Sequence, residues 1–234
     1  MTGDEKKRVV SNFCMYFCCK LLQMPLIHRR EIRTDAIIGI WEVTETEAEL
    51  LQLYPANADE LVTLNSYFYP YRRSQFLASR LLLHTLIPNA KIIYDANGKP
   101  FPDDKKMHIS LSHSGNLIAI MTDSKHCGID IETIGPKIEK IASKFLSDKE
   151  LIACAEEPVV QRMYVYWCVK EAIYKVEGKK NVSLKSDIFV ENVINPVTGI
   201  VKATLKQDGR SLSRNVYYEQ FGDCMLAWTE QPGE

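Results

Sequence analysis

The feature that most constrains the fold is a run of short apolar segments in the middle of the chain, separated by turn residues. Residues 108–122 (HISLSHSGNLIAIMT) predict two strands around a Ser-His-Ser-Gly turn, and residues 127–132 (CGIDIE) predict a third. Strands this close together in the sequence pair most readily as neighbours. The middle of the chain therefore predicts a β meander.

Before this meander the pattern is mixed. Residues 37–43 (IIGIWEV) predict a strand, and TETEAELLQLY after it predicts a helix with a Thr cap and acids in its first turn. Leucines recur at helical spacing over roughly 58–87, which predicts one long helix ended by Pro88-Asn89. Residues 91–101 (KIIYDANGKPF) predict a strand that enters an Asn-Gly turn.

After the meander, helices come first and strands follow. The segment IEKIASKFL is helical in pattern, with a break and a new cap at Ser147-Asp148. Residues 160–177 predict a clear helix that ends near Gly178. The remaining residues predict a second meander with an Asp-Gly turn.

This order predicts an α+β fold made of two similar α/β halves, with a seam near residues 124–136. We expect residues 1–24 to be an N-terminal extension that need not belong to the fold, residues 25–124 to form the first half, and residues 125–234 to form the second half. The halves show no convincing sequence repeat, so any similarity between them is topological.

Composition narrows the class of protein. The chain has 234 residues, of which 46% are hydrophobic and 25% charged, as in ordinary globular proteins. The formal net charge of −1 argues against a general nucleic-acid binder, which carries a marked basic excess. The seven cysteines form no CxxC pair, which favours reduced thiols and a cytoplasmic protein.

The N-terminal region imitates a signal peptide, because basic residues precede an apolar run (VVSNFCMYFCCKLL). Asn12 and Lys20 interrupt that run, and no cleavage-like site follows it. A membrane span takes roughly 20 apolar residues. We therefore expect no membrane association.

The first chemical signal is the pair of acids in GIDIE. Because side chains two apart on a strand share a face, Asp130 and Glu132 project together while Ile129 and Ile131 enter the core. Two carboxylates so placed repel each other unless a cation joins them, and Mg²⁺ suits such a site. The alternative is the exposed polar face of an amphipathic strand, which this pattern alone favours.

The second signal is WCVKEAIYK (167–175). On a helix, Trp167, Glu171 and Lys175 share one face. Val169, Ala172 and Ile173 mark the helix as closely packed, so Glu171 can face inward toward a site on the sheet. The alternative is a routine surface pair between Glu171 and Lys175.

Three further segments are basic or rich in hydrogen-bond donors. They are YRRSQFLASR (71–80), NGKPF (97–101) and SLSHSG (110–115). Hydroxyls, an imidazole and backbone N–H groups at the end of a strand can receive an anion. Each segment alone is equally well explained as a turn or a solvated charge.

Taken together and in order, these segments resemble the 4′-phosphopantetheinyl transferases of the Sfp type. The motifs that carry the resemblance are RR-x-x-FLASR, GKP, SHS, GIDIE, F-L-S-x-x-E (145–150) and W-x-x-KE-A-x-x-K. The resemblance covers roughly residues 37–190, and GIDIE with W-x-x-KE-A-x-x-K is its most specific part. Residues 1–36 carry none of the motifs, and the C-terminal strands fit only in general pattern.

The resemblance implies a pseudo-dimer of two similar halves with the active site in the cleft between them. It also implies transfer of the 4′-phosphopantetheine arm of coenzyme A to a serine of an acyl or peptidyl carrier protein. The other product is adenosine 3′,5′-bisphosphate. The reaction depends on Mg²⁺, with Mn²⁺ as an alternative ion.

Site residues follow from the same motifs. The resemblance implies that Asp130, Glu132 and Glu171 hold the metal, that Lys175 meets the phosphates and protonates the leaving group, and that Glu171, or a water it orients, takes the serine proton. The catalytic set is thus Asp130, Glu171 and Lys175. The residues implied to bind coenzyme A are Arg73, Lys99, Pro100, Ser112, His113 and Lys175, with His113 near the 3′-phosphate.

Several points stay open at this stage. Arg72, Arg73 and Arg80 compete for the 3′-phosphate, and Arg73 is preferred. Glu150 matches an acid of the family, yet a role in the first turn of a helix explains it equally well. Alternatives to the transferase are a Mg²⁺-dependent phosphohydrolase and a non-catalytic relative that binds carrier proteins. We expect a monomer, and the identity of the carrier is not encoded in any motif.

Overall fold

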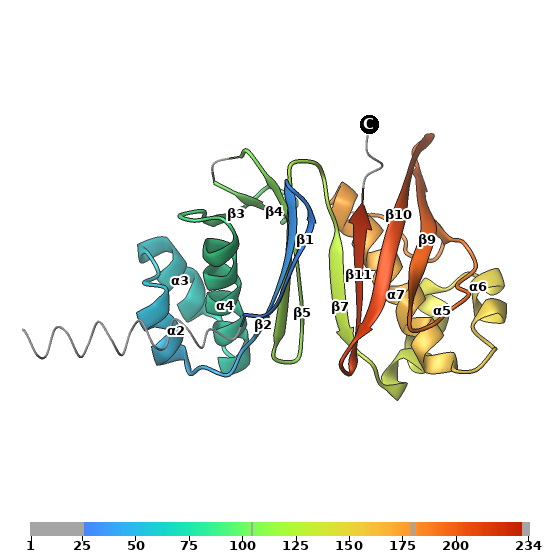
Figure 1. Cartoon of the computed structure of the whole chain (residues 1–234), viewed down its shortest axis with the longest axis horizontal. Helices are drawn as coiled ribbons and strands as arrows, with labels where there is room; N and C mark the ends of the chain where they lie inside the picture. Colours follow the sequence, from blue (N-terminus) through green and yellow to red (C-terminus); the bar gives the residue numbers. More distant parts are fainter. Residues whose placement is uncertain (1–25, 104, 179–180, 231–234) are drawn as a thin grey trace, which may run out of the picture.

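The computed structural model describes residues 26–103, 105–178 and 181–230. Two antiparallel sheets face each other in the middle of the molecule, and helices cover their outer sides (Figure 1). The first sheet has the order β1 (Leu26–Arg33), β2 (Ala36–Glu42), β6 (Leu117–Asp123), β5 (His108–Ser114). The second has the order β7 (Ile129–Thr133), β11 (Cys224–Glu230), β10 (Arg210–Phe221), β9 (Thr198–Gln207), β8 (Ile188–Val190).

The helices of the first half are α2 (Glu47–Leu53), α3 (Ala58–Ser66) and α4 (Pro70–Leu86). The expected single helix over 58–87 is wrong, because the chain turns between α3 and α4. Pro70 opens α4 at its first position, where proline is favoured, and it disfavours helical backbone in the residue before it. A small hairpin, β3 (Ile92–Tyr94) and β4 (Pro100–Pro102), follows and contains the expected Asn-Gly turn.

The helices of the second half are η1 (Pro136–Ile141), α5 (Ala142–Phe145), α6 (Asp148–Ala153) and α7 (Val159–Glu177). The segment expected to be one helix before Ser147 is instead a 3₁₀ turn followed by four α-helical residues. Ser147 caps α6 through a capping box with Glu150, as expected. Gly178 ends α7 with φ of 64°, a left-handed conformation suited to glycine.

Side-chain alternation along β11 explains why the two sheets can face each other. Met225 and Ala227 belong to the apolar cluster around α7, whereas Leu226 and Trp228 pack against the first sheet. Ile38 of β2 belongs to that second cluster. Both faces of β11 are therefore buried, and the seam between the halves is a true apolar core.

The predicted α+β class is confirmed. The predicted central meander is wrong for its third strand, because β7 pairs with β11 of the second sheet and not with β6. β1 was not predicted: its sequence, LIHRREIR, is an edge strand with polar residues at alternate positions. The predicted domain boundary lies in the connection between β6 and β7, and the predicted N-terminal extension lies outside the described residues. Among the described helices, none combines the length and the apolar character that a membrane span requires.

Candidate active site

The two acids of GIDIE lie on the face of β7 opposite its isoleucines. Ile129 and Ile131 pack in the core between the sheets. Asp130 and Glu132 consequently point to the other side, where α7 crosses the strand. Asp130 is only 3% exposed, so the alternative of a solvated polar face does not apply to it.

Helix α7 approaches this strand unusually closely. A Cβ atom added at Gly128 would lie 1.9 Å from the carbonyl oxygen of Ala172. Only glycine fits at this point, since a contact under 3.0 Å requires the backbone to shift. Glu171 directly precedes Ala172 in α7. The close approach therefore brings the acids of β7 near the part of the helix that carries Glu171.

Strand β5 of the first half holds the acids from its own side. Ser112 Oγ donates to Asp130 Oδ1 at 2.7 Å, and Ser114 Oγ donates to Glu132 Oε2 at 3.2 Å. Ser110 Oγ accepts the first backbone N–H of β7 at 3.0 Å. The three serines alternate along one face of β5, and this contact between the halves was not predicted. Its only sequence signal is the S-x-S-x-S spacing.

Lys175 of α7 reaches back to the strand. Its Nζ lies 2.7 Å from Asp130 Oδ1 and 3.0 Å from the carbonyl oxygen of Ile129. Asp130 Oδ2 is buried and makes no hydrogen bond to any described residue. Buried carboxylate oxygens are seldom left unpaired, so Oδ2 marks a place where a further positive group or donor fits.

The three carboxyls influence one another. Burial, followed by the nearby Asp130, raises the pKa of Glu171 to about 7, while Lys175 opposes the shift. Burial and Asp130 also raise the pKa of Glu132. Mutual repulsion of this kind is expected when acids gather without their cation.

The chemistry of the three carboxylates therefore suits a hard divalent cation. The site offers carboxylate oxygens, and one of them is buried with no hydrogen-bond partner among the described residues. Within the described residues, however, no three His, Cys, Asp or Glu side chains are already arranged as a closed metal site. A metal would thus have to draw the carboxylates of Asp130, Glu132 and Glu171 together, in competition with Lys175.

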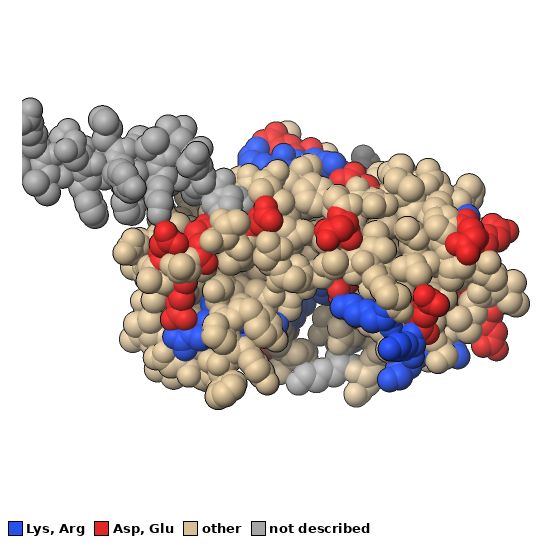
Figure 2. Space-filling model, turned by 90° about the horizontal axis from the view of Figure 1, so that it is seen from below, with Lys and Arg blue, Asp and Glu red and all other residues tan. Residues whose placement is uncertain are grey.

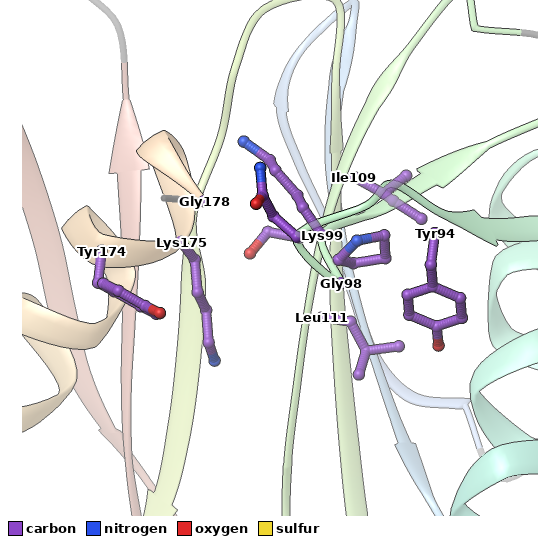
Figure 3. Close-up of a pocket in the computed structure, with 11 residues that line it drawn as sticks. Tyr94, Gly98, Lys99, Ile109, Leu111, Tyr174, Lys175 and Gly178 are labelled. Atoms are coloured by element: carbon purple, nitrogen blue, oxygen red, sulfur yellow. The ribbon is translucent and has the colours of Figure 1, made fainter. Parts of the chain in front are cut away.

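A hollow of about 270 Å³ lies beside these residues and is lined from both halves. Figure 3 shows Lys99, Ile109 and Leu111 of the first half facing Tyr174 and Lys175 of α7 across it. Pro100 also belongs to its lining. From below, the molecule is hollowed between the halves, and Lys and Arg side chains gather at the rim (Figure 2).

Lys99 and Gly178 meet at one end of this hollow. Lys99 Nζ donates to the carbonyl oxygen of Val176, and its burial lowers the pKa of its ammonium group. A Cβ at Gly178 would lie 2.4 Å from Lys99 Cδ. Glycine at position 178 therefore serves the left-handed cap and leaves room for Lys99.

His113 lies in a second, smaller hollow with Arg72. Arg72 Nη1 is 3.0 Å from His113 Nε2, and because a guanidinium only donates, this ring nitrogen accepts. Burial and the charge of Arg72 lower the pKa of His113. This second hollow, of about 170 Å³, shares Tyr94 and Leu111 with the first.

The other two arginines are paired with acids, although Arg80 also lines the hollow that contains His113. Arg73 makes a two-bond ion pair with Glu47, with both N–O distances at 2.6 Å. Arg80 is 4% exposed and pairs with Glu60. The structure thus brings Arg72 to His113 and does not bring Arg73 there.

Lys170 of the W-x-x-KE motif is fully buried. Its Nζ donates to Glu150 Oε2 at 2.7 Å and to the carbonyl oxygens of Phe145, Leu184 and Ile188. This ammonium joins α7 to α5, α6 and β8. Glu150 therefore both caps α6 and pairs with Lys170, and it lies away from the three acids.

Comparison with known proteins agrees with this geometry. Residues 126–223 match the family model of the 4′-phosphopantetheinyl transferase superfamily. This matched segment of the chain is similar to that superfamily, and the curated relatives found by sequence bear the same family name. The predicted resemblance is thereby confirmed.

Three relatives illustrate the similarity. The 4′-phosphopantetheinyl transferase HetI of Nostoc sp. is 27% identical over 162 residues, which cover 60% of this chain and 68% of that protein. The transferase AcpT of Escherichia coli is 37% identical, over 46% of this chain and 59% of its own. A 4′-phosphopantetheinyl transferase of Bacillus subtilis is 42% identical, over 39% of this chain and 42% of its own. The last two alignments span less than two thirds of those relatives.

The superfamily match contains the acids and Lys175 but begins after the first half. Lys99, Ser112 and His113 thus lie outside the residues matched by the family model. In the folded chain Lys99 contacts α7 and Ser112 contacts β7, whereas His113 contacts Arg72 of α4.

Proposed function

We propose that this protein transfers the 4′-phosphopantetheine moiety of coenzyme A to a serine of an acyl or peptidyl carrier protein. Adenosine 3′,5′-bisphosphate is the second product, and Mg²⁺ is required, with Mn²⁺ as a substitute. The match of residues 126–223 to the superfamily model and the names of the relatives support this proposal.

One observation carries the proposal. The Lys175 ammonium rests on Asp130 Oδ1, while Oδ2 of the same carboxylate is buried without a partner among the described residues. Lys175 lines the hollow formed by both halves, and its ammonium connects that hollow to Asp130. A cation held on one side of the acids and a lysine on the other form an arrangement suited to a pyrophosphate.

The coenzyme would lie along the two neighbouring hollows, which share Tyr94 and Leu111 in their linings. Lys99, Pro100 and Lys175 line the larger hollow, where the pyrophosphate and adenosine are expected. Arg72 and His113 line the smaller hollow, where the 3′-phosphate is expected. We favour Arg72 over Arg73 for this contact, because Arg73 is paired with Glu47.

In the proposed reaction the carrier serine Oγ attacks the phosphorus that bears the pantetheine. The P–O bond to the remaining phosphate of the nucleotide breaks, and Glu171, or a water it orients, takes the serine proton. Lys175 stabilises or protonates the leaving phosphate. Positioning and charge neutralisation are the main needs of phosphoryl transfer. The metal, held by Asp130, Glu132 and Glu171, would supply part of that neutralisation.

A mass-shift assay tests this proposal. The protein is incubated with Mg²⁺, coenzyme A and an apo carrier protein, and both the carrier mass and the released nucleotide are measured. Transfer predicts a heavier carrier and an equal amount of adenosine 3′,5′-bisphosphate. Nucleotide release without a heavier carrier would indicate a phosphohydrolase instead, and no change in either would contradict both enzymes. A fatty-acid, a polyketide and a peptide-synthetase carrier should be compared.

We also propose that the protein acts as a cytoplasmic monomer, without nucleic acid or membrane partners. Two halves in one chain already supply both sides of the hollow, so the site needs no second copy. Sedimentation at several protein concentrations tests this, and a concentration-dependent dimer would contradict it.

A further inference from the structure

A third hollow, of about 220 Å³, lies on the other side of the Lys99 hairpin. Four groups that can carry positive charge line it, together with one acid and several apolar residues. The four are Lys99, Lys105, His108 and His126. Lys99 and Pro100 separate it from the hollow assigned to coenzyme A, since both residues line both spaces.

Two of these groups are stacked imidazoles. The ring centroids of His108 and His126 lie 4.1 Å apart with an interplanar angle of 34°. His108 stands on β5, and His126 lies in the connection that leads into β7. The pair therefore spans the seam between the halves, at a place that the proposed transfer reaction does not use.

The positive groups are close enough to repel one another. Burial and the charge of Lys99 lower the pKa of His108, and burial, His108 and Lys99 lower the pKa of His126. Arg214 of β10 acts on His126 in the same direction. Positive charges gathered around a hollow repel one another, and an anion bound in the hollow would stabilise them.

Nearby acids offset the positive charge around this hollow only in part. Asp95 lines the hollow, and its Oδ1 accepts the backbone N–H groups of Asn97 and Lys99 at 2.8 Å each. Asp123 lies across from His108, and both of its carboxylate oxygens accept hydrogen bonds from Arg33 Nη2 at 2.9 Å. Glu177 at the end of α7 raises the pKa of His126, although burial and the neighbouring cations prevail.

We propose that this hollow binds a phosphate group through His108, His126 and Lys99, at a site distinct from the coenzyme A cleft. The phosphate would stabilise the protonated imidazoles, so binding strengthens as the pH falls toward 6. Because Lys99 lines both hollows, a phosphate held here would also draw on a side chain that lines the cleft.

Titration with sulfate, read by NMR, tests the site on the full chain. Sulfate stays dianionic between pH 6 and pH 8, so any pH dependence belongs to the protein. We expect the imidazole resonances of His108 and His126 to move with added sulfate, with affinity about tenfold higher at pH 6 than at pH 8. Sodium chloride at matched ionic strength is the control. The signals come from the two histidines themselves, so the result is independent of transferase activity.

Variants sharpen the test. His108→Gln with His126→Gln should weaken sulfate binding at pH 6 by about tenfold or more and remove its pH dependence. His84→Gln, at an exposed position on α4, should bind as the original chain does. Unmoved resonances, or equal shifts in chloride, would overturn the proposal, as would unchanged affinity in the double variant.

Two further ligands identify the source of the phosphate. Inorganic phosphate and glycerol 3-phosphate are titrated in the same way. Shifts with both assign the site to the phosphate group of a larger molecule. Shifts with inorganic phosphate alone assign it to the free ion, and shifts with neither overturn the proposal.

Discussion

Gly128, the residue before β7, lies against the backbone of Ala172 of α7: a Cβ at position 128 would lie 1.9 Å from the Ala172 carbonyl oxygen. This contact fixes the distance between the strand that carries Asp130 and the helix that carries Glu171. The glycine of GIDIE is thus as much a part of the site as its acids.

Replacing Gly128 with alanine should therefore push α7 away from β7. We expect a loss of stability of about 2–4 kcal/mol, as for other backbone overpacking, and a loss of transfer that exceeds the loss of folded protein. Urea unfolding and the mass-shift assay measure the two effects. Gly135→Ala is the matched control, since no described atom lies within 4 Å of its Cβ position. Equal behaviour of the two variants would refute the role of Gly128.

Ser112→Ala removes the hydroxyl that donates to Asp130 Oδ1. Hydrogen bonds to charged groups contribute about 1.5–3 kcal/mol, so the rate of transfer should fall by roughly 10- to 100-fold. The fold should persist, because the residue is small and lies in a paired strand. Ser143→Ala, at an exposed position on α5, should leave the rate unchanged. A wild-type rate for Ser112→Ala would show that Lys175 alone orients Asp130.

Glu171→Gln tests the raised pKa of the buried carboxyl. In the metal-free protein the folded pKa is about 7, above the ordinary value of 4.5. The folded state therefore holds the proton more tightly, and the free energy of unfolding should fall as the pH rises from about 4.5 through 7. Gln carries no charge and escapes this loss, so above pH 7 the variant should be more stable by on the order of 2 kcal/mol.

Urea unfolding in a chelator at pH 5 and pH 8 measures this difference. Glu139→Gln, a surface acid on η1, is the control and should follow the original pH dependence. Parallel pH profiles for the original chain and Glu171→Gln would contradict the burial of the carboxyl. Added Mg²⁺ should stabilise the original chain more than Glu171→Gln.

Arg72 and Arg73 can be distinguished with two forms of the coenzyme. Arg72→Gln should raise the KM for coenzyme A by roughly tenfold and have little effect with dephospho-coenzyme A, which lacks the 3′-phosphate. Arg73→Gln should lower the free energy of unfolding only slightly, because it breaks a partly exposed ion pair with Glu47. If Arg73→Gln shows the selective KM effect instead, the assignment is reversed.

Much of the fold was predictable because its signals are local. The Ser147 cap, the Gly178 stop and the Asn-Gly turn each depend on a few adjacent residues, and each prediction is confirmed. The break between α3 and α4 was missed because leucine spacing continues across it while Pro70 restarts the helix. β1 was missed because an edge strand can be polar at alternate positions.

The site was predictable only where a motif lies on one element. The motifs placed Asp130 and Lys175 in one predicted site, but their direct contact at 2.7 Å was not predicted. The contact of Arg72 with His113 joins residues 41 positions apart, and nothing local distinguishes Arg72 from Arg73. The serine contacts to β7 depend on how two sheets face each other, which a single sequence does not specify.

Ser112 and Asp130 belong to different halves, joined by one connection at whose start Ser124 is exposed. Cutting the chain at that exposed point would give two fragments, each with its own sheet and its own covering helices. Neither fragment would hold a complete hollow, since one keeps Lys99 and the other keeps Lys175. Activity recovered after the two fragments are mixed would then show that they have reassociated. The fold is therefore suited to a split-protein sensor.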